Sequence, residues 1–352
     1  MLDKITIIIP SFQRKNYLKK NINYWKNSKV KVIILDGSQE KLQFENLKSY
    51  QNIKYLHFPE KTLFERLGLA SQLIETEYGI LCCDDELYLE NGLLACVGEL
   101  EKNKDLSCAM GRVLCFRYRD NKKKLVGFSG YNQFKNYYLD YDNPLQRVRM
   151  HMANGMGRPT MYSLTRSVYF REILRLVSKS NQFPCQQTYE LQSDICLAYY
   201  GKIKFVENLT WLRNFDEQPL WPRGKHFFEK WYLNKSSKKD VQKLLFMTSE
   251  SLYSIDKRHE LSHISKMLDE VLMLYSLNKI KTEKTLKKVW SGLIAPKIIS
   301  YIKKIINDNL IYTFKKIFFS ELDIFLAAEK LKNTGVNFEK KELDKAVKVL
   351  ND

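Results

Sequence analysis

Short apolar runs without polar alternation are the feature of this chain that most restricts its fold. The two clearest lie at residues 5–9 and 30–35, and two further strands are expected at 53–58 and 78–83. Strands that are apolar on both faces are typical of a parallel sheet covered by helices on both sides. Segments with helical spacing alternate with these strands, at residues 16–25, 44–50 and 63–74. The pattern predicts an α/β fold with a Rossmann-like, mostly parallel sheet and helices on both faces.

The signals change twice farther along the chain. Between residues 106 and 220 we expect strands at 125–130 and 203–206, an apolar strand from 159 that leads into a helix ending near 178, and a helix at 187–200 closed by Gly201. Beyond residue 225 glycine and proline become rare and helical patterns dominate. We therefore predict one α/β domain over residues 1–225 and an α-helical C-terminal region over 226–352.

Composition limits the classes of function. No apolar run approaches the roughly 18–20 residues that span a bilayer. The seven cysteines are odd in number and form no Cys-x-x-Cys pair, which argues against a disulfide framework or a zinc ribbon and favours a reducing cytoplasm. The net charge of +18 is compatible with nucleic acid, an anionic membrane surface or phosphorylated substrates. Because the charge is spread along the chain and no nucleic-acid-binding motif concentrates it, nucleic acid is an unlikely partner.

Three consecutive acids, Asp84, Asp85 and Glu86, follow the fourth predicted strand. Strand ends in an open α/β sheet reach the ligand crevice at its carboxyl edge. Carboxylates gathered there repel one another unless a cation neutralises them, and oxygen ligands suit Mg²⁺ or Mn²⁺. The alternative is a solvated acidic turn that begins the next helix.

Six segments then resemble a known family when they are taken in order. They are TIIIPSFQR, VIILDGS, Glu65-Arg66-Leu67-Gly68, YGILCCDDELYLENGL, the segment RPTMYSLTR at 158–166, and Glu190-Leu191-Gln192-Ser193-Asp194. Together they resemble family 2 glycosyltransferases with the GT-A fold, over residues 4–220. The resemblance is greatest to a bacterial subgroup whose metal motif is an Asp-Asp-Asp triplet. Residues 1–225 would then be the nucleotide-sugar-binding and catalytic domain, and 226–352 would provide acceptor, membrane or oligomer contacts.

The resemblance implies a role for each matching residue. Pro10, Ser11 and Arg14 would line the pocket for the base and ribose of the donor. Asp36 would hydrogen-bond the base or ribose, and Arg66 would approach the diphosphate. The acids would occupy an Asp-x-Asp motif that serves donor and metal, with the first and third positions at Asp84 and Glu86 and Asp85 between them. The third acid departs from the family pattern, since glutamate carries its carboxylate farther out than aspartate, so which of the three ligates the metal stays open.

The family supplies a general base from an acid at the start of a helix. Asp194 is the first candidate in this chain and Glu190 is the second. Their spacing of four residues would place both on one face of a helix. The alternative for Asp194 is an ordinary exposed acid.

The function implied by the resemblance is inverting, metal-dependent transfer from a nucleotide sugar. A UDP-sugar is the favoured donor, Mn²⁺ or Mg²⁺ the cofactor, and a glycan or glycolipid the acceptor, as in bacterial surface polysaccharide assembly on the cytoplasmic side. A nucleotidyltransferase of related fold is one alternative, although residues 11–14 lack the glycine-rich loop expected of it. A zinc peptidase using His259 and His263 is another, because His259-Glu260-Leu261-Ser262-His263 matches H-E-x-x-H.

Three further features each have two interpretations. His151 could face the acceptor, but a single histidine in a loop is weak evidence. Four residues after the last predicted strand could form a lid or a packed domain joint: Trp211, Arg213, Trp221 and Arg223. The basic amphipathic segment 281–319 could lie on an anionic membrane surface, which would make the protein peripheral, or pack on the catalytic domain. Oligomer formation stays open.

Overall fold

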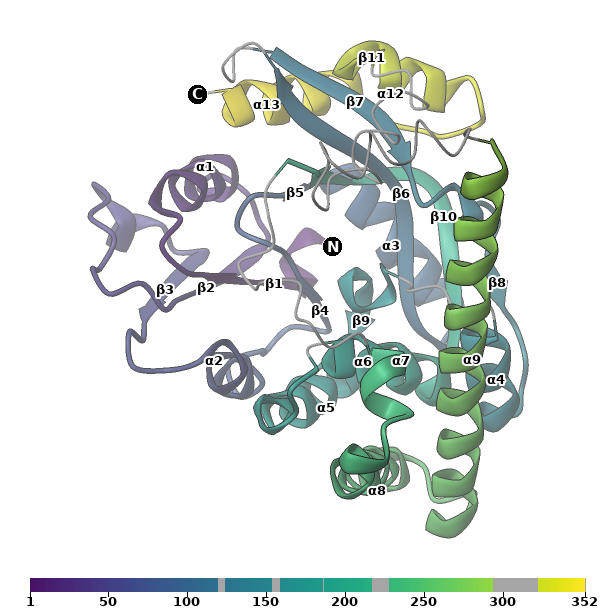
Figure 1. Cartoon of the computed structure of the whole chain (residues 1–352). Coiled ribbons are helices and arrows are strands. Elements are labelled where there is room, and N and C mark those ends of the chain that lie inside the picture. The colour runs from purple at the N-terminus through teal and green to yellow at the C-terminus, as the bar shows by residue number, and fades with distance from the viewer. Residues whose placement is uncertain (120–123, 154–158, 186, 217–227, 294–321, 352) are drawn as a thin grey trace, which may run out of the picture.

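The computed structural model describes residues 1–119, 124–153, 159–185, 187–216, 228–293 and 322–351, with side chains described outside 159 and 282–293. The described chain forms one mixed, eleven-stranded sheet with helices around it (Figure 1). Along the main path the strand order is β11-β7-β6-β9-β4-β1-β2-β3, and β10 pairs with β5, β6 and β8. The predicted α/β class, with parallel strands at the centre of the N-terminal half, is confirmed.

The N-terminal half is the parallel part of the sheet. Its strands are β1 (Ile5–Ser11), β2 (Lys31–Asp36), β3 (Ile53–His57) and β4 (Tyr78–Leu81). Both β2 and β4 pair with β1 in parallel, and the register sets Ser11 opposite Asp36 at the carboxyl edge. The isoleucines of β1 are buried on both faces, because α1 (Lys15–Trp25) and α2 (Leu63–Ala70) lie on opposite sides of these strands (Figure 1).

One predicted helix is wrong. The segment 44–50 contains a single 3₁₀ turn, Leu47–Ser49, in place of a helix. Asn46 has a φ of 56°, in the left-handed region that a right-handed helix cannot include. Phe44, Leu47 and Tyr50 still pack on the core, which explains their apolar spacing.

The second half of the sheet is built around a long strand, β6 (Leu106–Arg119). It pairs antiparallel with β7 (Lys124–Gly130) and β9 (Leu164–Arg166) and parallel with β10 (Lys202–Asn214). The predictions identified β7, but they placed β10 at residues 203–206 only. Short strands β5 (Leu87–Tyr88) and β8 (Tyr138–Leu139) pair with β10. Helices α5 (Ser167–Ser178) and α6 (Gln187–Tyr200) are confirmed, whereas α3 (Glu90–Lys102) and α4 (Pro144–Met152) were not predicted.

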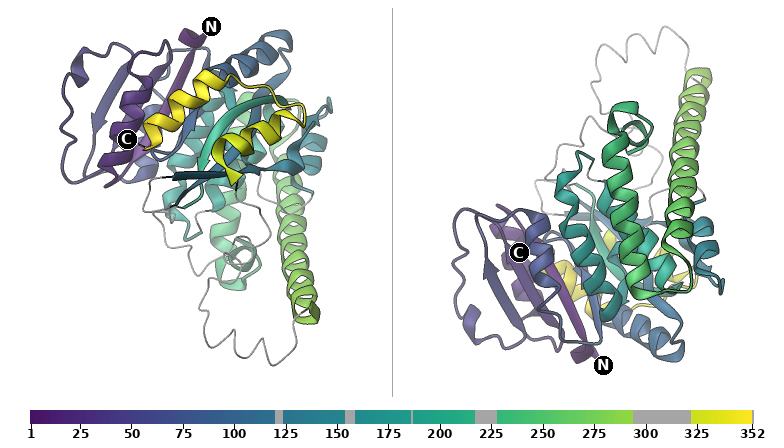
Figure 2. Two further views of the ribbon diagram at one scale, coloured as in Figure 1. Left: turned by 90° about the horizontal axis from the view of Figure 1, so that it is seen from above. Right: turned by 90° about the horizontal axis from the view of Figure 1, so that it is seen from below.

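The region beyond residue 225 is mainly helical, as predicted. It contains α7 (Phe228–Tyr232), α8 (Lys238–Ile255), α9 (Leu261–Leu293), α12 (Ile324–Lys332) and α13 (Lys340–Asn351). A short strand, β11 (Leu322–Asp323), joins the edge of the sheet beside β7, and α13 lies along α1 (Figure 2). The boundary near 225 falls outside the described residues and stays a prediction. Every helix within the described ranges is too short or too polar to cross a bilayer.

Candidate active site

The three consecutive acids lie between β4 and β5, at the carboxyl edge of the sheet. All three side chains are buried, so the interpretation as a solvated acidic turn is wrong. Asn21 on α1 holds this connection, since its side-chain amide donates to the backbone oxygen of Asp84 at 2.6 Å. Asn21 was not predicted as a site residue, although a polar side chain within the apolar stripe of that helix is a signal that could have identified it.

Asp84 faces the ends of β1 and α1. Its carboxylate accepts a hydrogen bond from the Ser11 hydroxyl at 2.7 Å and one from Arg14 at 3.2 Å. Arg14 also lies 3.0 Å from Asp85, so one guanidinium links the two acids. Burial, followed by the charge of Asp85, raises the pKa of Asp84 to about 7, although Arg14 and Ser11 oppose the shift.

Glu86 faces the opposite side, toward β10. The indole Nε1 of Trp211 donates to its carboxylate at 2.9 Å, and Arg213 Nε lies 3.7 Å from it. Burial is the main reason that the pKa of Glu86 rises to about 8, with the charge of Asp85 adding to it and Arg213 and Trp211 opposing it. The Trp211 ring is stacked against three tyrosines that the sequence analysis missed: Tyr88, Tyr131 and Tyr162.

A divalent cation fits this cluster. Among the described residues, ligand atoms of Cys83, Asp85 and Glu86 lie within 4.8 Å of one another. Asp84 is not part of this group, and its oxygens face Ser11 and Arg14. Asp85 and Glu86 are both buried, burial is the main cause of the raised pKa of Glu86, and carboxylate oxygens are the ligands that Mg²⁺ and Mn²⁺ prefer. Asp85 and Glu86 are therefore the acids best placed to hold such an ion.

The predicted donor residues meet at the ends of β1 and β2. A pocket of about 630 Å³ opens there and is lined by residues that include Gln13, Arg14 and Ser38. Asp36 lies behind it, buried, and accepts hydrogen bonds from the Ser38 amide at 2.9 Å and the Tyr55 hydroxyl at 2.6 Å. Pro10 is half-buried on β1. The structure thus brings the predicted base and ribose residues beside Asp84.

Arg66 is buried beneath this pocket. Its guanidinium donates to the backbone oxygens of Ser11, at 2.7 Å, and Leu35. A Cβ atom on Gly37 would lie 2.6 Å from the Arg66 Cζ, so the glycine lets the chain pass directly over this side chain. Arg66 therefore joins the ends of β1 and β2, and its predicted contact with a diphosphate stays a prediction.

The two candidate bases occupy different environments. Asp194 is only 2% exposed and accepts a hydrogen bond from the Thr160 hydroxyl. Glu190, one turn earlier on α6, is exposed, and desolvation by its neighbours raises its pKa. The pKa of Tyr162 shows which side chains lie near it. Burial raises this pKa most, followed by the charges of four neighbours: Cys83, Tyr189, Glu190 and Glu86. Glu190 therefore lies near the same tyrosine as the carboxylate cluster.

His151 and the remaining predictions lie elsewhere. His151 is fully buried, with Nδ1 2.8 Å from the Tyr137 hydroxyl and Nε2 3.5 Å from Thr160, so it offers no surface to an acceptor. Trp221, Arg223 and the part of segment 281–319 from 294 onward lie outside the described residues, as do the side chains of 282–293. His259 precedes α9, which begins at Leu261, so the helical pairing with His263 needed by a zinc peptidase does not form.

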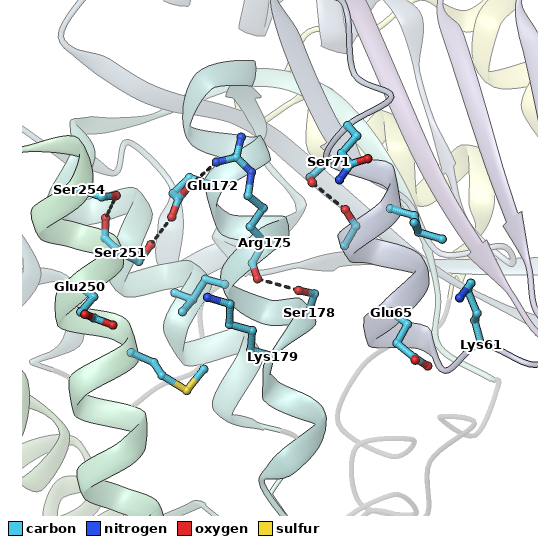
Figure 3. A pocket seen from close by; sticks show the side chains of 15 residues that line it. Lys61, Glu65, Ser71, Glu172, Arg175, Ser178, Lys179, Glu250, Ser251 and Ser254 are labelled. Atoms are coloured by element: carbon cyan, nitrogen blue, oxygen red, sulfur yellow. Dashed lines mark hydrogen bonds and ion pairs between the residues drawn. The ribbon is translucent and has the colours of Figure 1, made fainter.

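Another pocket in the described part of the chain lies apart from this chemistry. It measures about 660 Å³ and lies between α2, α5 and α8 (Figure 3). None of the predicted site residues lines it. Its best-placed acid, Glu172, already accepts from Ser251 and pairs with Arg175 at 3.0 Å.

Comparisons with known proteins identify one matching family model and several similar structures. Residues 6–174 match the family model described as Glycosyl transferase family 2. A crystal structure of S. aureus TarS 1–349 in complex with UDP-GlcNAc is similar, with a TM-score of 0.50 and 13% identity over 77% of this chain and 72% of that one. Crystal structures of S. aureus TarS and of TarS 1–349 with UDP have TM-scores of 0.44 and 0.46, identities of 13% and 12%, and coverage of 76% of this chain and 42% and 70% of theirs.

No curated protein matches the chain. The family match spans β1 to α5, including the acids between β4 and β5, and the structural likeness supports the same fold. Residues 6–174 form a glycosyl transferase family 2 match, and the chain is a glycosyltransferase with the GT-A type of α/β fold.

Proposed function

We propose that this protein transfers a sugar from a UDP-sugar to a hydroxyl acceptor, with inversion at the anomeric carbon and with Mn²⁺ or Mg²⁺ as cofactor. The observation that carries the proposal is the placement of three buried acids beside the pocket at Arg14 and Ser38. The family supports glycosyl transfer. The choice of UDP is supported by the similar TarS structure, which is in complex with UDP-GlcNAc.

The residues divide the work by position. Arg14, Asp36 and Ser38 bind the nucleoside, and Asp85 and Glu86 hold the cation. When bound, a divalent ion offsets the negative charge that builds on the leaving diphosphate. Trp211 donates a hydrogen bond to the Glu86 carboxylate and Arg213 attracts it, and together they orient it toward the reacting sugar.

We assign the general base to Glu190, the second candidate of the sequence analysis, ahead of Asp194. The acceptor oxygen bonds to the anomeric carbon, the bond from that carbon to the diphosphate oxygen breaks, and the electron pair leaves with the diphosphate. The proton of the acceptor hydroxyl passes to the Glu190 carboxylate. A base must reach the acceptor from open space, and a raised pKa suits proton transfer near neutral pH. Asp194 is supported less well because it is buried and already hydrogen-bonded to Thr160.

Thermal unfolding with UDP tests the metal and donor assignments. UDP should raise the melting temperature only with Mn²⁺ or Mg²⁺ present, since a ligand at 100 times its Kd adds about 2.7 kcal/mol. The double substitution Asp85→Asn/Glu86→Gln should abolish the shift, and His259→Ala should retain it. A full UDP shift in the double variant, or one that needs no metal, would refute the assignment. NMR of the product should show the anomeric configuration opposite to the donor's.

The biological setting extends the same proposal. A glycan or glycolipid acceptor, assembly of a bacterial surface polysaccharide, and a place in the cytoplasm or on the inner face of its membrane all rest on the sequence resemblance.

A further inference from the structure

Cys83 differs from the other six cysteines of the chain in its exposure and in its surroundings. Those six are buried, whereas Cys83 is partly exposed, so ions and reagents in solution reach its thiol. It follows β4 and directly precedes the three acids, in the segment to which the proposed function assigns the cation. Its thiol therefore adds a sulfur to a group of carboxylate oxygens at the carboxyl edge of the sheet.

The adjacent thiols of Cys82 and Cys83 have different neighbours. The Cys82 thiol is fully buried and donates to backbone oxygens, that of Cys83 at 3.3 Å and that of Glu86 at 3.5 Å. The Cys83 thiol instead lies 3.9 Å from the hydroxyl of Tyr162, whose ring is stacked on Trp211. Because Trp211 also donates to the Glu86 carboxylate, Cys83 and Glu86 border the same aromatic group.

The hydroxyl of Tyr88 holds the tyrosine beside this thiol. It donates to the backbone oxygen of Leu81, the last residue of β4, at 3.0 Å, and to that of Tyr162 at 2.8 Å. Tyr88 is itself fully buried. The contact between Cys83 and Tyr162 is thus fixed by packing within the fold, although the two residues are 79 positions apart.

The thiol lies close enough to two of the acids to share an ion with them. Its sulfur and one oxygen each of Asp85 and Glu86 lie within 4.8 Å of one another. An ion about 2.3 Å from a sulfur and about 2.0–2.2 Å from carboxylate oxygens keeps such ligand atoms roughly 3.5 Å apart, so side-chain rotations of about 1 Å close the set. Arg14 pairs with Asp85 and Arg213 faces Glu86, and a bound ion shares these carboxylates with the two arginines.

One sulfur among oxygens changes which ion the site prefers. Mg²⁺ takes oxygen ligands and gives up its water reluctantly, so a thiolate contributes little to its binding. Thiolate ligands suit softer ions, and the affinity of a mixed site rises from Mn²⁺ to Co²⁺. Zn²⁺ is likewise bound by thiolate and carboxylate together. The chemistry of this donor set therefore fits a transition metal better than Mg²⁺.

We propose that Cys83 is a ligand of the catalytic cation together with Asp85 and Glu86, and that its sulfur makes the site select Mn²⁺ over Mg²⁺ and bind Co²⁺ and Zn²⁺ more tightly still. The inference rests on the metal-dependent transfer proposed above and adds the side chain that chooses the ion. The thiolate is the form that binds a metal, so the thiol proton passes to solvent on binding.

The absorption of bound Co²⁺ tests the proposal. A bond between Co²⁺ and a thiolate gives a charge-transfer band in the near ultraviolet, which oxygen ligands do not give. We expect this band to grow as Co²⁺ is added to the full chain, with and without saturating UDP. Zn²⁺ and Mn²⁺ should each remove it at lower concentrations than Mg²⁺.

Reaction of the thiols with Ellman's reagent gives a second reading. The partly exposed Cys83 should react faster than the six buried cysteines of the native chain. Zn²⁺ should slow this fast reaction, and Mg²⁺ at the same concentration should leave it unchanged.

Substitutions assign both signals to one residue. Cys83→Ser exchanges the sulfur for an oxygen, so it should abolish the band and the fast reaction with Ellman's reagent. It should weaken Co²⁺ binding at least about 10-fold, since even the loss of a group that only supports a ligand has an effect of this size. Cys82→Ser is the matched control, because that thiol is buried against the backbone, and it should retain the band. Circular dichroism checks the folding of both variants.

Three outcomes would overturn the inference: a band of equal strength in wild type and in Cys83→Ser, Co²⁺ binding that raises the melting temperature of the wild type without a band, or competition by Mg²⁺ as effective as that by Zn²⁺. Failure of the proposed function is separate, since it appears as the loss of the metal-dependent UDP shift. The Co²⁺ band without nucleotide is then still interpreted by itself.

Discussion

Replacing Glu190 by glutamine tests the base assignment most directly. Glutamine keeps the shape of the side chain but cannot accept the acceptor's proton, so turnover should fall about 10²–10⁴-fold. Because Glu190 is exposed, the substitution should change the free energy of unfolding by no more than about 0.5 kcal/mol. The UDP shift should stay near normal, since this side chain lies away from the donor pocket.

The pH profile gives a second reading of the same residue. A base acts in its deprotonated form, so wild-type turnover should fall as the pH drops below the pKa of Glu190. Desolvation raises that pKa, so the fall should begin above the usual range of a glutamate. This fall in turnover at low pH should be missing from the residual activity of Glu190→Gln. Turnover is measured as UDP release, with circular dichroism as the check on folding.

Asp194→Asn is the matched control on the same helix. The Asp194 carboxylate is buried and accepts from Thr160, so asparagine should cost about 1–3 kcal/mol of stability and lower the melting temperature. Turnover below the melting transition should stay within about 10-fold of wild type, because the change removes no base. A large loss of turnover in Asp194→Asn at an unchanged melting temperature, with normal turnover in Glu190→Gln, would refute the assignment.

Two further substitutions test the parts of the fold that support the site. Gly37→Ala would place a Cβ 2.6 Å from the Arg66 guanidinium, so it should lower the free energy of unfolding by about 1–3 kcal/mol and weaken the UDP shift. The control Gly98→Ala, whose Cβ meets open space in a helix, should stabilise the protein slightly. Equal melting temperatures for the two variants would contradict this. Glu342→Ala should lower the free energy of unfolding by about 1–2 kcal/mol and with it the melting temperature, because Glu342 accepts hydrogen bonds from the first backbone amides of α3. A comparable loss in Glu339→Ala, at an exposed position, would show that this cap contributes nothing specific.

Local sequence was enough for the parallel strands and for the place of the acids. The apolar runs at β1 and β2 predict burial on both faces, and the end of β4 predicts acids at the sheet edge, because both follow from period and chain order alone. Apolar spacing misled at 44–50, where a left-handed Asn46 breaks the helix. It also identified only the start of β10, whose pairing with β6 rather than its own pattern sets its length.

The tertiary structure alone decided how the site is divided among its acids. Glu86 is held by Trp211, 125 residues away, and Asp84 by Ser11, 73 residues away, so no local pattern shows that these two acids of one short segment face opposite sides. Helical spacing placed Glu190 and Asp194 on one face, but packing around Thr160 buries one and leaves the other exposed. The spacing of apolar residues specifies the direction in which a side chain points from its own helix or strand. Its burial and its hydrogen-bond partners depend on which other elements pack against it.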